Sequence, residues 1–120
     1  MNVLEQARLL SKAIKDAPES VRFNCAKAAI QGDLKAKEMI DDFHAKEFYL
    51  QQMQMMGQEI PSDKMAEMQK LDEVLMLSPQ IAEYLQAERA LNMLFADIFK
   101  IVGESFEMLK DLMQAKMGLG

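Results

Sequence analysis

Apolar side chains recur along this chain at helical spacing. In the first segment Val3, Ala7, Leu10, Ile14 and Ala17 follow one another at intervals of four, three, four and three residues. These intervals place them on one face of a helix. The same period continues through later segments, while threonine is absent and β-branched residues are few, which disfavours a sheet. We therefore predict an all-α fold, a bundle of about five helices.

Prolines, glycines and capping residues divide the pattern. Pro18 ends the first helix because proline lacks an amide proton and disfavours helical geometry at the preceding residue. Gly32 is expected to be a left-handed C-terminal cap, Asp33 an N-cap, and Ser62 or Asp63 the cap of the fourth helix. The predicted helices cover residues 3–16, 18–31, 34–56 and 64–77, and a fifth begins at Ser78-Pro79. The side chains expected to point inward are Phe23, Ala26, Ile30, Ala36, Ile40, Phe43, Leu50, Met65, Met68, Leu71 and Leu75.

The fifth helix is long for a chain of this size. Unbroken from Pro79 to Lys116 it would span about 57 Å, whereas a compact monomer is only roughly 35 Å across. Either its end projects onto another chain, or Gly103 with the next two residues breaks or bends it. We favour the break or bend at Gly103, with a helical segment beyond it.

Two heptad series run along this helix, with Phe99, Phe106 and Met113 on an adjoining face. This apolar surface is wider than one partner helix can cover, so the segment is either an ordinary core helix or one that serves both the core and an oligomer interface. We predict a homodimer or higher homo-oligomer, whose interface uses some of Phe95, Phe99, Val102, Phe106, Leu109 and Leu112. Glu88 interrupts one series. It should meet a cation, with Arg8, Lys12 or a second chain as candidates, or lie at a solvated rim.

Composition narrows the function classes. The 120 residues are expected to form one domain over 1–120, and the net charge of −5 lies in the second half without a basic stripe, which argues against direct nucleic-acid binding. Charged residues interrupt the N-terminal apolar positions, so neither a signal peptide nor a membrane span is expected. A single cysteine, Cys25, cannot form an intrachain disulfide and suggests the cytoplasm.

Candidate chemistry is sparse. Asp41 and His44 have the spacing of di-iron bundle ligands, and a metal-binding bundle or a small enzyme using this pair is the alternative to an interaction protein. His44 is the only histidine, however, and Cys25 is expected to be a buried thiol. Twelve methionines fit a core or partner surface better than a Cu(I) site. We therefore expect no catalytic residues, no metal and no cofactor.

The sequence resembles the YlbF/YmcA family of small bacterial regulators, most closely its YheA-like branch. The resemblance covers about residues 3 to 112, and its strongest element is the run from Tyr84 to Asn92. The other matching stretches are Ala7 to Ile14, Ile40 to Phe43, Gln51 to Met53, Gly57 to Ile60, Pro79 to Glu83 and Ile98 to Val102.

The resemblance implies an all-helical, oligomeric accessory protein of the cytoplasm that lacks catalytic residues and acts on a regulatory protein partner. Better-studied members act in a complex that affects competence, sporulation and biofilm formation through an endoribonuclease. Those members carry a C-terminal cysteine pair linked to iron–sulfur binding. Residues 100–120 contain no cysteine, and Cys25 alone cannot supply four thiolates, so neither the cluster nor its complex is transferred to this chain.

Overall fold

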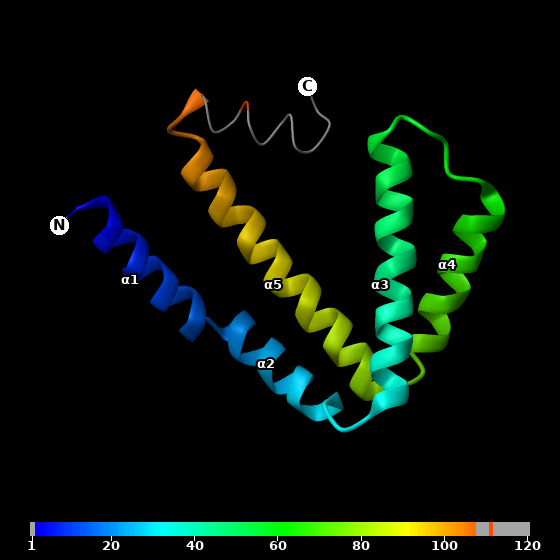
Figure 1. Cartoon of the computed structure of the whole chain (residues 1–120). Coiled ribbons are helices and arrows are strands. Elements are labelled where there is room, and N and C mark those ends of the chain that lie inside the picture. The colour runs from blue at the N-terminus through cyan, green and yellow to red at the C-terminus, as the bar shows by residue number, and fades with distance from the viewer. Residues whose placement is uncertain (1, 108–110, 112–120) are drawn as a thin grey trace.

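The computed structural model describes residues 2–107 and 111. This part of the chain contains five helices and no strand, which confirms the all-α prediction. The helices are α1 (Val3–Asp16), α2 (Pro18–Ile30), α3 (Leu34–Met55), α4 (Ser62–Leu75) and α5 (Pro79–Gly103). Figure 1 shows α1 and α2 following each other end to end, α2 beside α5, and α3 and α4 as a hairpin. The first group is α1, α2 and α5, and the second is α3 and α4. The two groups meet at one end and diverge at the other, and we call their diverging parts the arms (Figure 1).

Side-chain caps begin three of the helices. The Asn2 side chain accepts from the Glu5 amide at 2.8 Å, and Asp33 accepts from the Ala36 amide at 3.0 Å. Ser78 caps α5 by accepting from the Ile81 amide at 3.4 Å. The predicted caps at Asp33 and Ser78 are confirmed. Each satisfies an amide that the first turn of the helix leaves unpaired.

Two other predicted caps are wrong. Gly32 has no positive φ. The residue that caps α2 is Gln31, with right-handed backbone, and the Asp33 amide donates to the Ile30 carbonyl at 3.0 Å. Ser62 and Asp63 lie inside the first turn of α4, which starts directly after Pro61 and has no side-chain cap. Among described residues, Gly57 alone has a positive φ, +75°, where the chain leaves α3.

The hydrophobic core lies where α2, α3, α4 and α5 meet, and we call this region the vertex. Leu75 and Leu85 are its most deeply buried large side chains, with 0% and 1% of their surface exposed. The predicted inward faces of α2 and α3 are confirmed at their buried positions. The buried residues of the cluster are Ile30, Ala36, Ile40, Phe43, Leu75, Ile81 and Leu85, with Met39, Met68, Leu71 and Tyr84 packed against it.

Two side chains predicted to be buried are exposed. Met65 is 51% exposed, because only the C-terminal half of α4 reaches the vertex core, through Met68, Leu71 and Leu75. Cys25 is also exposed, since α2 turns Ala26 and not its neighbour toward the interior. The prediction of a buried thiol was therefore wrong.

The long last helix ends at Gly103, so the break expected there is present. Leu109, Leu112 and Met113 lie outside the described residues, and so does most of the segment predicted to continue the helix. The shape is open. The radius of gyration is 17.4 Å, against about 14 Å for a compact chain of this length, and the thinnest extent is 16 Å. Apolar faces on the arms are consequently left without a covering layer.

Candidate functional site

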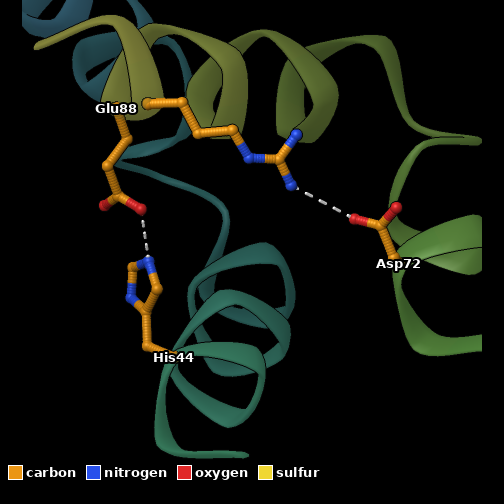
Figure 2. A network of polar contacts seen from close by, with 4 residues as sticks. His44, Asp72 and Glu88 are labelled. Atoms are coloured by element: carbon orange, nitrogen blue, oxygen red, sulfur yellow. Dashed lines mark hydrogen bonds and ion pairs between the residues drawn. The ribbon is translucent and has the colours of Figure 1, made fainter. Parts of the chain in front are cut away.

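Three side-chain pairs join α5 to the other helices of the vertex. Arg22 of α2 holds Glu83 through two nitrogens, at 2.9 and 2.8 Å. Arg89 contacts Asp72 of α4 at 3.4 Å. In Figure 2, Glu88 of α5 and His44 of α3 point toward one another, and their Oε1 and Nε2 atoms lie 2.7 Å apart. The three pairs show which sides of α5 face α2, α4 and α3.

Glu88 therefore meets His44, and neither Arg8 nor Lys12 is its partner. Arg8 and Lys12 belong to α1, whereas Glu88 faces α3. Its side chain is 24% exposed and that of His44 is 34% exposed, so the pair is half-buried and not part of the apolar core. Arg89 points to α4 instead, as its helical position requires.

Tyr84 and Asp41 extend this polar region. The Tyr84 ring lies 6.5 Å from the His44 ring and 5.3 Å from Phe23, between centroids. Partial burial raises the pKa of Tyr84 above its ordinary value, and the charges of Glu88 and Asp41, with a hydrogen bond to Glu88, raise it further. A negative phenolate would lie beside two carboxylates here, so the neutral phenol is favoured.

This arrangement is poor in catalytic chemistry. The Nε2 atom of His44 is engaged by Glu88, while Asp42 pairs with Lys46 at 3.0 Å on the solvated side of α3. No three His, Cys, Asp or Glu side chains in the described ranges, 2–107 and 111, are placed to hold a metal ion. The Asp41 and His44 pair thus lacks the further ligands that a di-iron bundle uses.

Open cavities flank the vertex. One of about 460 Å³ lies among α2, α3 and α5, where Lys27, Lys37, Asp41 and Tyr84 line it. Another, of about 540 Å³, lies between α3 and α4 beside Arg89. Neither His44 nor Cys25 is among the described residues that line these two cavities.

The distal half of α5 presents an uncovered apolar row. Phe95, Phe99 and Val102 follow Glu88 at steps of seven, four and three residues, so they continue the helical face that points toward α3. Phe106 lies just beyond the end of α5 at Gly103. The exposed fractions of the four side chains are 37%, 57%, 42% and 61%. These are the four described members of the predicted oligomer interface, and Leu109 and Leu112 complete that prediction outside the described part. We call this row the α5 inner face.

Helix α3 has a matching row that the sequence reasoning missed. Phe48 and Met55 follow His44 at steps of four and seven residues and therefore share the face that points toward α5. Phe48 is 61% exposed and Met55 is 48% exposed. The spacing from His44 could have revealed this row, but only once His44 was known to face α5. We call it the α3 inner face.

Helix α1 is the third uncovered element, because none of its residues is buried. The stripe identified in the sequence is present, but packing against the rest of the chain is slight. Val3 is 81% exposed, Leu4 64%, Leu9 52% and Leu10 40%. Exposed apolar surface of this extent is typical of an interaction site in a folded protein.

Fold and site together define an open, all-helical protein with apolar faces that residues 2–107 leave uncovered. The family model described as "Control of competence regulator ComK, YlbF/YmcA" matches residues 3–116. The chain therefore belongs to the YlbF/YmcA family, as its resemblance indicated. No described helix is long and apolar enough to cross a membrane.

Named relatives agree with this assignment. A "UPF0342 protein" of Caldicellulosiruptor bescii is 40% identical over 111 residues, covering 92% of this chain and 93% of the relative. Another UPF0342 protein, from Symbiobacterium thermophilum, is 33% identical over 103 residues, which cover 86% of this chain and 92% of the relative. A solved structure from Bacillus stearothermophilus, titled as a protein of unknown function (DUF964), has a TM-score of 0.72 at 21% identity. It covers 90% of this chain and 95% of the other, and it shows the shared fold.

Proposed function

We propose that this protein is a non-catalytic regulatory adaptor of the cytoplasm, which works by protein contact and self-associates through the α5 inner face. One observation carries the proposal. Four large apolar side chains in the distal half of α5 and just beyond its end, Phe95, Phe99, Val102 and Phe106, are 37% to 61% exposed. Membership of a family described by its control of a competence regulator supports a regulatory role exerted on another protein.

Burying this row favours association. A large apolar side chain contributes roughly 1.5 to 3 kcal/mol when it is buried, so the four contribute about 6 to 12 kcal/mol before the cost of association is subtracted. A micromolar dimer needs about 8 kcal/mol. The gross gain is not yet a net affinity, because association itself costs about 4 to 15 kcal/mol, so contacts beyond this row must contribute to a stable dimer.

Sedimentation equilibrium at tens of micromolar tests self-association. We expect wild-type protein to sediment at a multiple of its 13.7 kDa chain mass, and Phe99→Asp to sediment near that mass with its helical circular dichroism retained. Met93→Asp is the matched control, because Met93 is 68% exposed on the opposite side of the same helix. Wild-type protein sedimenting at about 13.7 kDa would contradict the proposal.

A further inference from the structure

We propose that the α3 and α5 inner faces together form a docking site for helix α1 of a second copy of this chain, and that the exchange is reciprocal. This inference rests on the proposed function, since it names the partner of the same surface. It adds two elements that the interface predicted on α5 did not contain, the α3 inner face and helix α1.

The orientation of the two inner faces follows from a single contact. Because His44 and Glu88 meet at 2.7 Å, every residue in helical register with them also points across the space between the arms. Phe48 and Met55 lie in that register on α3, and Phe95 and Phe99 on α5. All four are 37% to 61% exposed, so the described residues do not fill this space.

Helix α1 has the properties of the missing occupant. Its ridge of Val3, Ala7 and Leu10 is narrow and aliphatic, which suits insertion between two walls that carry bulky aromatic residues. Its 14 residues extend about 21 Å. None is buried by its own chain. The helix cannot reach the site within one molecule, because α1 joins α2 directly at Ala17 and lies on the far side of α5 from α3 (Figure 1).

Charge complementarity favours the same pairing. Arg8, Lys12 and Lys15 make α1 net positive against Glu5 and Asp16, and none of these three cations forms an ion pair within residues 2–107. Three carboxylates lie in or beside the receiving site, and Lys27 and Lys37 line the cavity at its vertex end. At the vertex end of the site, the charges of Asp41 and Glu88 raise the pKa of the Tyr84 hydroxyl. Glu47 borders the α3 inner face. The net opposite charges of helix and site steer their encounter, while the apolar ridge of α1 makes the contact, because the three cations lie off that ridge.

Reciprocal exchange closes the assembly. When α1 of each copy docks on the inner faces of the other, the same contact forms twice about a two-fold axis and no copy of the site stays open. A dimer that paired only α5 with α5 would leave both α1 helices and both α3 inner faces exposed. The exchanged arrangement covers all three uncovered surfaces with one contact.

Disulfide cross-linking between two single-cysteine chains tests the exchange. In a Cys25→Ala background, chains carrying Leu10→Cys are mixed with chains carrying Phe99→Cys, and the mixture is oxidised and separated without reductant. We expect the mixed disulfide to predominate over the Phe99→Cys self-link by at least several-fold. Lys12→Cys is the matched control, because it lies on the opposite face of α1, and it should cross-link poorly with Phe99→Cys.

Sedimentation of two charged variants separates this inference from the proposed function. We expect both Leu10→Asp and Phe99→Asp to raise the dimer dissociation constant at least tenfold. If Phe99→Asp dissociates while Leu10→Asp sediments like wild type, or if the Phe99→Cys self-link predominates, the exchange is wrong and the α5 interface stands. If Phe99→Asp itself sediments like wild type, the proposed function fails at this surface. The cross-linking result decides the matter if Leu10→Asp loses helical structure.

Discussion

The vertex and the arms of this molecule are built from the same kinds of helix, but they bury their apolar side chains to different extents. At the vertex, Leu75 and Leu85 are buried by neighbouring helices of the same chain. On the arms, Phe48 and Phe99 are 61% and 57% exposed. Hydrophobic spacing therefore identifies a face that must be buried, but not whether the covering surface belongs to the same chain. The vertex accounts for the fold, and the arms provide the surface available for association.

The largest expected effect distinguishes the two regions by stability. Leu85→Ala should lower the free energy of unfolding by about 2 to 5 kcal/mol, because it leaves a cavity in the vertex. Phe99→Ala should change it by less than about 0.5 kcal/mol when the protein is dilute enough to be monomeric. Urea denaturation of both variants measures the difference. Equal losses at low concentration would show that α5 is buried within one chain along its whole length.

A smaller effect on the free energy of unfolding is expected at the His44–Glu88 pair, which lies at the edge of the vertex. Glu88→Ala removes the partner of His44, and we expect a loss of about 1 kcal/mol, since both side chains keep contact with water. Glu73→Ala is the control, because Glu73 is exposed and forms no ion pair in the described part of the chain. A loss above about 3 kcal/mol would instead mean that the pair is sealed from solvent in the assembly.

The smallest effect concerns alkaline pH. The pKa of Tyr84 is raised above its ordinary value of 10.0 by partial burial, aided by Glu88 and Asp41. The folded state therefore holds the phenolic proton more tightly than the unfolded chain, and the resulting stability is fully present below pH 10 and lost as pH rises through the folded pKa. Tyr84→Phe should remove this part of the pH dependence.

Melting temperatures of wild type and Tyr84→Phe, compared from pH 8 to 11.5, measure this contribution, and Tyr49→Phe is the control at an exposed tyrosine. The wild-type curve should fall more steeply above pH 10 than that of Tyr84→Phe. Parallel curves would show that Tyr84 is not shielded at the vertex.

Much of the fold was predictable because it depends on local chemistry. The apolar period, the break at Pro18, the caps at Asp33 and Ser78 and the end of the last helix at Gly103 each rest on residues close in sequence. The cap errors at Gly32 and Ser62 have the same origin. Each cap was predicted from the residue type alone. In the structure Gly32 has no positive φ, and α4 begins at Ser62 without a side-chain cap.

Most of the candidate site was not predictable in this way. His44 and Glu88 are 44 residues apart, and nothing local shows that they meet. The sequence showed that the apolar surface around Phe95 and Phe99 is wider than one partner helix can cover. It could not identify Phe48 as part of the opposite row, because that depends on which side of α3 faces α5. The exposure of Cys25 and Met65 depends likewise on which turns of their helices reach the vertex.

The sequence by itself determined that this chain is helical, where most of its helices begin and end, and which side of each is apolar, because these properties follow from backbone sterics and side-chain period. Only the tertiary structure decided which apolar sides are covered. The helices converge at the vertex and spread along the arms, and the angles between them depend on side-chain packing between segments far apart in the chain. The same hydrophobic pattern therefore yields a core around Leu85 and an open surface around Phe99.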